Sequence, residues 1–159
     1  MRYEYKNPTF KKGINEKLSI DQNTHSIFGA SKLSADILVQ EYGRYFDIHT
    51  CCLRAGCITG PNHAGVELHG FLNYLIKCNV NKIKYSIYGY KGKQVRDNIH
   101  AFDLVQFIRF FLEKPRIAEV YNIGGGKKNS ISILEAFEKI TNLSGIKMLS
   151  EYKKEARVG

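Results

Sequence analysis

The sequence predicts an α/β fold with parallel strand pairing. Helical and strand-like segments alternate along its 159 residues, as they do where helices join the strands of a parallel sheet. Apolar residues make up 43% of the chain, enough to build a core, which excludes a disordered chain. The chain opens with a polar stretch and a helix, and it contains no GxGxxG sequence. A complete doubly wound domain begins with a strand and that turn, so we expect the first half of such a domain to lie outside this chain.

The first half of the chain predicts two helices around one strand. Residues 1–24 are polar and irregular, with proline and glycine as breakers. From 26 to 46, apolar side chains recur at steps of three and four residues, which indicates a helix. The stretch 48–56, IHTCCLRAG, predicts a buried strand and is followed by a loop at 58–65, ITGPNHAG. A second helix is expected at 66–80.

The second half continues the alternation of strands and helices. Residues 83–100 are rich in β-formers around Gly89 and Gly92, which predicts two short strands and a turn. A third helix is expected at 101–114, because Pro115 ends the helical pattern.

Further strands and a last helix are expected towards the end of the printed sequence. Residues 118–125, AEVYNIGG, predict a strand with a glycine turn, and 130–143 predict a fourth helix. Ser132 with Glu135 fits a capping box at the start of that helix. A last strand is expected at 146–152.

The four cysteines predict no metal centre and no disulfide framework. Cys51, Cys52, Cys57 and Cys78 form no CxxC pair, and three of them lie in or next to the strand-like run. Reduced cysteines are typical of the cytoplasm. No stretch has the length of a membrane span, and the first residues lack the apolar core of a signal peptide. We therefore expect a cytoplasmic protein that does not bind a membrane.

The net charge of +9 favours anionic partners, such as nucleic acid or phosphorylated small molecules. The densest basic group surrounds one glycine-containing segment and includes Lys82, Lys84, Lys91, Lys93 and Arg96. Such a group is as consistent with a solvated surface as with a ligand site. No nucleic-acid-binding motif is present, so binding to nucleic acid is not expected.

The sequence FGASK carries one candidate for chemistry. Residues four apart on a helix stack on one face, so a tyrosine one turn before a lysine forms a general base, because the ammonium lowers the pKa of the phenol. Here Lys32 is present, but residue 28 is Phe28, which has no ionisable proton. Taken alone, an aromatic residue one turn before a lysine is common on ordinary helices.

Four motifs in order strengthen this candidate. FGASKLSAD, LRAGCITGP, YGYKGKQVRDNIHAFD and EVYNIGGG follow one another along the chain. In order and spacing they resemble the extended short-chain dehydrogenase/reductase family of NAD-dependent nucleotide-sugar epimerases and dehydratases, and within it particularly the CDP-paratose 2-epimerase (CDP-tyvelose epimerase) group. The resemblance covers almost the whole chain. It implies the C-terminal part of a Rossmann-type fold with its substrate-binding region, without the GxGxxG half that precedes it in the family.

The resemblance assigns roles to individual residues. Lys32 matches the family lysine that holds the nicotinamide ribose of NAD and activates the catalytic tyrosine, and Phe28 stands at the position of that tyrosine. Arg96 matches an arginine that contacts the nucleotide, and a guanidinium suits phosphate.

Other residues are implied to border the substrate. Gly60 and Pro61 match the end of the loop beside the substrate pocket, and Lys93 could face a sugar-nucleotide pyrophosphate. Cys57 stands where many relatives have an asparagine that contacts substrate. Within the same motifs, Asp97 and His100 are expected to brace the local fold.

These assignments lead to two expectations about the chain as a whole. Residues 1–60 would end the dinucleotide-binding half, and 61–159 would form mostly the substrate-binding region with returning sheet elements. The function implied is that of a fragment or truncated homologue of an NAD-dependent nucleotide-sugar epimerase/dehydratase. If active it would act on a CDP-linked deoxysugar, and we expect the chain to have little or no activity alone. The alternative is a non-catalytic remnant or partner subunit that binds nucleotide sugar or dimerises. A homodimer or a complementary N-terminal half is the expected protein partner, with an apolar helix face at Leu38, Val39 and Tyr42 suited to association.

Overall fold

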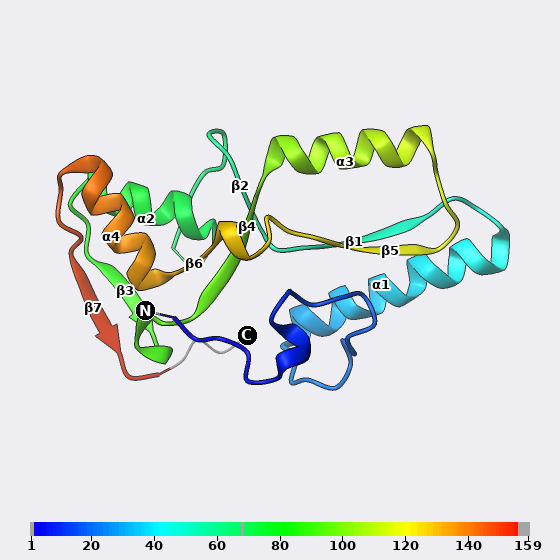
Figure 1. Cartoon of the computed structure of the whole chain (residues 1–159), viewed down its shortest axis with the longest axis horizontal. Helices are drawn as coiled ribbons and strands as arrows, with labels where there is room; N and C mark the ends of the chain where they lie inside the picture. The colour runs from blue at the N-terminus through cyan, green and yellow to red at the C-terminus, as the bar shows by residue number, and fades with distance from the viewer. Residues whose placement is uncertain (1, 68, 156–159) are drawn as a thin grey trace.

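The computed structural model describes residues 2–67 and 69–155. The predicted α/β class and parallel pairing are confirmed, because three of the four strand pairs among these residues are parallel. Figure 1 shows two groups of elements joined by the long strand β4. One group holds β1 and β5 between two helices, and the other holds α2, α4, β3 and β7.

Helix α1 spans Ile27–Phe46, close to the predicted 26–46. The side chain of Ser26 caps its start by accepting a hydrogen bond from the Gly29 amide at 3.1 Å. Asp47, with a φ of 54°, ends the helix in the left-handed conformation.

Strand β1 (Cys51–Ala55) runs parallel to β5 (Glu119–Ile123) and forms the centre of the first group. Helices α1 and α3 lie on opposite sides of this pair in Figure 1. Helix α3 (Ala101–Glu113) packs through Phe107, whose ring centroid lies 5.0 Å from that of Tyr121 on β5. The predicted strands and third helix of this group are therefore confirmed.

A central three-stranded sheet links the two groups. Strand β4 (Val95–His100) pairs in parallel with β2 (Cys57–Thr59) and antiparallel with β6 (Ser130–Ser132). The prediction was wrong in two places here, because the expected loop at 58–65 begins inside β2 and the expected helix at 130–143 begins only after β6. Each missed strand has three residues, too few to show a repeating pattern.

The second group is built on β3 (Tyr85–Tyr88) and β7 (Ser150–Lys153), which are parallel. Helices α2 (Phe71–Val80) and α4 (Ile133–Ser144) pack together on this pair. Their buried core is formed by Leu75, Cys78, Ala136 and Met148. The predicted capping box at the start of α4 is confirmed.

Helix α2 begins five residues later than predicted, because Gly70 stands before it with a φ of 71°. The preceding chain folds back on this helix: a Cβ on Gly65 would lie 2.2 Å from the Tyr74 amide nitrogen. Val66 and His69, which were expected to be helical, instead form a small antiparallel bridge with each other. This return brings the loop after β2 against the start of α2.

Three short 3₁₀ helices complete the described chain: η1 (Pro8–Phe10), η2 (Tyr90–Gly92) and η3 (Lys127–Asn129). No helix of the described residues is long and apolar enough to cross a membrane. Within the same residues, the four cysteines are free and no cluster of His, Cys, Asp and Glu has the arrangement of a metal site.

Candidate functional site

A cleft of about 830 Å³ lies between the start of α1, the central sheet and the second group. Three of the residues predicted from the sequence line it: Phe28 on α1, Cys57 on β2 and Arg96 on β4. Further lining residues come from α2, β3 and the segments next to them, among them Glu67, Phe71, Tyr74, Tyr85, Tyr88, Tyr90 and Gln94. The cleft therefore combines one guanidinium and one carboxylate with many aromatic rings.

Phe28 and Lys32 form a pair on the first turns of α1. Phe28 is 71% exposed, and the Lys32 ammonium lies 5.3 Å from the centroid of its ring. This is the stacking of residues four apart that the helix periodicity predicts. Lys32 is exposed, and its ammonium carries three N–H donors. The helix thus presents a cation and an aromatic ring, but no group that can exchange a proton at position 28.

Arg96 is exposed on β4, and its guanidinium donates one hydrogen bond to the Val95 carbonyl at 3.1 Å. Cys57 lies on the neighbouring strand, opposite Asn98. Burial raises the pKa of the Cys57 thiol, and the nearby positive charge of Arg96 opposes this rise to a smaller extent. Near neutral pH the thiol is therefore protonated, so it can donate a weak hydrogen bond but cannot act as a base.

Gly60, Pro61 and Lys93 do not line the cleft. The Gly60 carbonyl accepts a hydrogen bond from the Asn73 side chain at 3.0 Å, which ties the loop after β2 to helix α2. The Lys93 carbonyl accepts a hydrogen bond from the Tyr3 amide at 3.0 Å. Through these carbonyl groups, Gly60 and Lys93 help to hold the frame around the cleft.

Asp97 and His100 make the local contacts expected of bracing residues. An Asp97 carboxylate oxygen accepts the Gly125 amide at 3.0 Å and so fixes the glycine turn after β5. Nδ1 of His100 accepts the Phe102 amide at 3.1 Å and caps the start of α3. Neither side chain lines the cleft.

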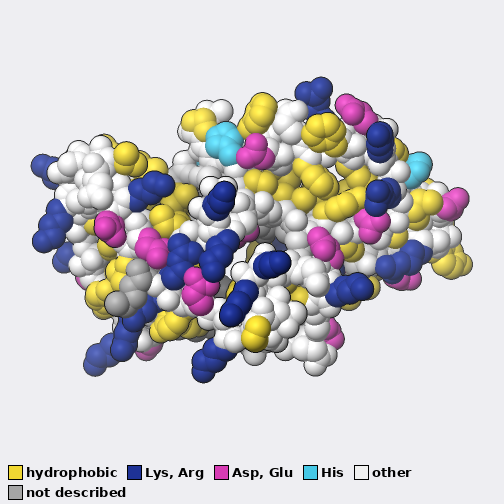
Figure 2. Space-filling model, viewed as in Figure 1, with side chains coloured by type: hydrophobic (Ala, Val, Ile, Leu, Met, Phe, Trp, Pro, Cys, Tyr) yellow, Lys and Arg dark blue, Asp and Glu magenta, His cyan; other side chains and the backbone are white. Residues whose placement is uncertain are grey.

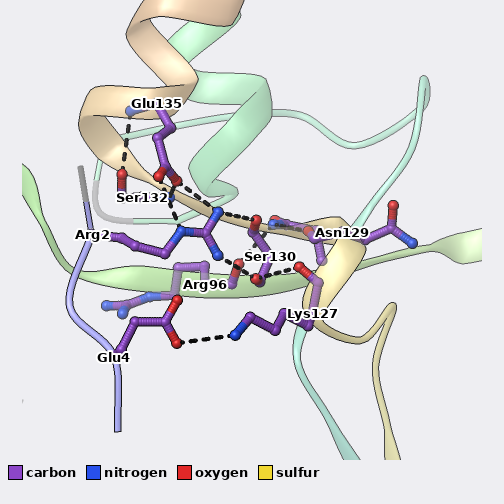
Figure 3. A network of polar contacts seen from close by, with 9 residues as sticks. Arg2, Glu4, Arg96, Lys127, Asn129, Ser130, Ser132 and Glu135 are labelled. Carbon is purple, nitrogen blue, oxygen red and sulfur yellow. Dashed lines mark hydrogen bonds and ion pairs between the residues drawn. The ribbon is translucent and has the colours of Figure 1, made fainter. Parts of the chain in front are cut away.

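A polar network beside the cleft was not predicted from the sequence (Figure 3). Arg2 donates to both carboxylate oxygens of Glu135 at 3.0 and 2.8 Å, and to the hydroxyl and carbonyl oxygens of Ser130 at 2.8 and 2.9 Å. Figure 3 shows Arg96 on β4 next to this network. The hydrogen bond from Arg2 is the main reason why the pKa of Glu135 falls to about 2. The network fastens the first residues of the chain to α4.

One wall of the cleft is aromatic and contains Tyr74, Tyr85, Tyr88 and Tyr90. This aromatic wall was not predicted either, although the stretch KYSIYGY contains three of these tyrosines. The ring of Tyr85 lies 5.8 Å from that of Tyr74, and the Tyr88 hydroxyl donates to Glu67 at 3.2 Å. Desolvation is the largest cause of the rise in the pKa of Tyr74 to about 12. This hydroxyl therefore stays protonated at neutral pH. The pattern identified strands here, but only the long-range fold turns the tyrosines towards one cleft.

Figure 2 shows Lys and Arg side chains over much of the visible surface, most densely at the left and below, with hydrophobic side chains among them. Hydrophobic side chains are also exposed over α3 and the β1–β5 pair. Leu38, Val39 and Tyr42 of α1 are 57%, 37% and 55% exposed, so the predicted apolar helix face is uncovered in the single chain.

The parallel strand pairs and flanking helices define an α/β protein with a cleft where its two groups of elements meet. Residues 4–124 match the model of the NAD dependent epimerase/dehydratase family, so the chain belongs to this family. It is 31% identical over 146 residues to CDP-paratose 2-epimerase of Salmonella typhi, covering 86% of this chain and 41% of that protein.

Two solved structures extend the comparison. MoeE5 in complex with UDP-glucuronic acid and NAD is similar with a TM-score of 0.74 and 25% identity, over 95% of this chain and 50% of that one. A Tyr-to-Phe mutant of UDP-glucuronic acid 4-epimerase from Bacillus cereus, in complex with a fluorinated UDP-sugar and NAD, matches with a TM-score of 0.69 and 28% identity. It covers 92% of this chain and 46% of that one. The chain thus spans about two fifths to one half of the length of these relatives.

Proposed function

We propose that the chain forms the substrate-binding part of an NAD-dependent nucleotide-sugar epimerase or dehydratase, and that its substrate is a CDP-linked deoxysugar. The observation that carries this proposal is the cleft, which places Arg96 beside an aromatic wall. A guanidinium suits a diphosphate, and flat rings suit a base or a sugar face. Membership of the family and similarity to CDP-paratose 2-epimerase support the substrate class. The division at residue 60 belongs to the same proposal, as does a cytoplasmic location, which accords with four free cysteines.

The residues near the cleft suit one portion of NAD, a ribose. Lys32 is exposed and does not line the cleft, but it lies over the ring of Phe28, which does, and its ammonium can donate hydrogen bonds to ribose hydroxyls. Bound NAD would supply the hydride acceptor for oxidising a sugar hydroxyl. Because the sequence contains no GxGxxG turn for a pyrophosphate, we propose that tight binding of NAD requires a complementary polypeptide half.

Proton transfer is the step that these residues support least. Phe28 cannot accept the proton of a sugar hydroxyl, and the Cys57 thiol, whose pKa is raised by burial, is already protonated. These two observations favour the second candidate function, a subunit that binds nucleotide sugar without turning it over. The Tyr-to-Phe mutant crystallised with a UDP-sugar and NAD is an example of binding by a family member that carries such a substitution.

Calorimetric titration of the purified chain with CDP-glucose and UDP-glucose, with and without NAD, tests the proposal. We expect binding of CDP-glucose and little or no turnover. Arg96→Met should weaken binding by about tenfold or more, since hydrogen bonds to charged groups contribute roughly 1.5–3 kcal/mol. Lys128→Met removes the same charge from an exposed site outside the cleft and should leave the affinity unchanged. Equal losses in the two variants would mean that overall charge, not the cleft, attracts the ligand.

A further inference from the structure

The turn between β3 and β4 has an unusual backbone. Tyr90 and Lys91 are consecutive residues with φ values of 49° and 53°, and the flanking Gly89 and Gly92 have φ values of 61° and 70°. The Gly92 amide donates to the Gly89 carbonyl at 3.5 Å, which closes the turn. Two central positions with positive φ are normally occupied by asparagine or glycine. Tyrosine and lysine are therefore strained there.

The other non-glycine residues with positive φ in the described chain have local explanations. Asp47 ends α1, and Lys82 directly follows the end of α2, where left-handed residues are common. Ala118 packs tightly against Gly43, at whose position a Cβ would lie 3.0 Å from that of Ala118. Among the non-glycine residues that the structure describes, only Tyr90 and Lys91 are consecutive residues with positive φ. Neither helix capping nor close packing accounts for them.

The turn is fixed in place, and burial does not compensate for its strain. Gly92 is buried, and a Cβ there would lie 3.0 Å from a methyl group of Leu134, so the chain cannot shift towards α4. Tyr90 is 60% exposed, and its side chain lines the cleft. Strained backbone that the surrounding structure enforces is concentrated at functional sites. A large ring in a strained, mostly exposed position points to a ligand contact.

The surroundings define the class of ligand. Tyr85 and Tyr88 line the same cleft, and Arg96 supplies its positive charge. A ligand with a flat heterocycle and phosphate groups satisfies both features. We propose that Tyr90 is a ligand-contacting residue whose ring stacks on the base of a nucleotide, and that the strained turn holds the ring in position. This rests on the proposed function, because it assigns one residue to the nucleotide end of that site.

Opposite effects on stability and affinity test this assignment. Tyr90→Gly removes both the ring and the strain, so it should raise the Tm by roughly 2–4 °C and weaken binding of CDP and UDP by about tenfold or more. Tyr90→Asn, which also tolerates positive φ, should give the same loss of affinity. Tyr90→Phe keeps a flat ring and should retain binding of both nucleotides.

Lys82→Gly is the matched control, because it relieves a φ of 54° outside the cleft. It should raise the Tm by a similar amount and leave the affinity for CDP unchanged. Glucose 1-phosphate is the control ligand. Its binding should be the same in the parent and in Tyr90→Gly, because it has no base.

Tyr90→Gly could leave the affinity for CDP unchanged, or weaken the binding of glucose 1-phosphate as much as that of CDP. Either result would overturn the assignment of Tyr90 but not the proposed function. A fall in the Tm of both Tyr90→Gly and Tyr90→Asn would show that the ring stabilises the fold, and would also overturn it. If the parent chain binds neither CDP nor UDP, the proposed function fails together with this assignment.

Discussion

Phe28 lies one helical turn before Lys32, with the ammonium 5.3 Å from the centroid of the ring. Phe28→Tyr should therefore create a phenol whose pKa is lowered by the neighbouring charge. The difference between the pH titrations of tyrosine absorbance in variant and parent measures that pKa. The double variant Phe28→Tyr, Lys32→Met lacks the ammonium charge, so the pKa of its new phenol should be higher than in the single variant. Identical titrations of the single and double variants would show that the two side chains are not coupled.

Arg2 anchors the first residues of the chain through the carboxylate of Glu135. The pKa of Glu135 falls from 4.5 to about 2 in the folded protein. Because the folded value is the lower one, the stabilisation is complete above pH 4.5 and is lost as the pH falls towards 2. Arg2→Met should cost about 1–2 kcal/mol of unfolding free energy at pH 7, and the cost should shrink on acidification.

Urea unfolding at pH 7 and pH 3 measures this change. Lys6→Met is the control, because it removes the same charge from an exposed position in the same segment. It should have little effect at either pH. If Arg2→Met costs the same at both pH values, the ion pair is not the source of the stabilisation.

At the level of single elements, alanine substitutions at two glycines of α1 should change the stability of the protein in opposite directions. Gly43 is where the helix meets the sheet: a Cβ there would lie 2.2 Å from the Thr50 hydroxyl and 3.0 Å from the Ala118 amide nitrogen. Gly29 is in the same helix, and its closest Cβ contact would be an ordinary 3.5 Å. Gly43→Ala should therefore destabilise the protein by about 1–3 kcal/mol, whereas Gly29→Ala should stabilise it by about 0.5–1 kcal/mol.

Urea midpoints of the two variants measure these effects, and each glycine serves as the control for the other. Equal shifts in the same direction would mean that helix propensity alone determines both. An unchanged midpoint for Gly43→Ala would mean that α1 can move away from β1 without cost.

The pattern of elements shows how far the sequence determines this fold. Helices α1 and α3 and strand β5 were predicted closely, because long periodic runs end at clear caps or at proline. Strands β2 and β6 were missed because three residues carry no periodicity. The two predicted strands at 83–100 exist as β3 and β4, but they belong to different sheets. Such pairing depends on contacts between distant segments, for example β3 with β7.

The candidate site shows the same limit. Phe28, Cys57 and Arg96 were singled out from motifs and do line one cleft. Tyr88 and Tyr90 were not, because several tyrosines in a β-rich stretch are equally typical of ordinary strands. Their position against α2 and β4 follows from the tertiary fold.

For the whole molecule, the two edges of the β1–β5 pair differ. On the outer edge of β5, the Asn122 amide donates to the Glu16 carboxylate at 2.8 Å, and its side chain donates to the Ile14 carbonyl at 3.0 Å. On the β1 side, no other described strand pairs with that edge. The N-terminal segment therefore covers one edge and leaves the other open.

The open edge can be traced to individual backbone groups. The Gly56 amide donates to the Ile123 carbonyl on β5 at 2.9 Å. Because backbone groups alternate sides along a strand, the N–H of Ala55 points to the open edge. Unpaired strand edges recruit other strands, and exposed apolar residues of α1 and α3 flank this one. These features are consistent with the expected association with a second copy or with a complementary half.

We therefore expect the purified chain to self-associate at roughly micromolar to millimolar concentrations, and sedimentation measures this directly. Ala55→Pro removes the free donor without breaking a hydrogen bond to β5, so it should shift the population towards monomer. Salt at about 1 M screens surface charges and should leave association intact, because strand pairing and apolar contact do not depend on them. A parent chain that sediments as one monomer and unfolds cooperatively would contradict a docking role for this edge. If salt abolishes the association and Ala55→Pro does not change it, the chains associate through their charged surfaces and not through the β1 edge.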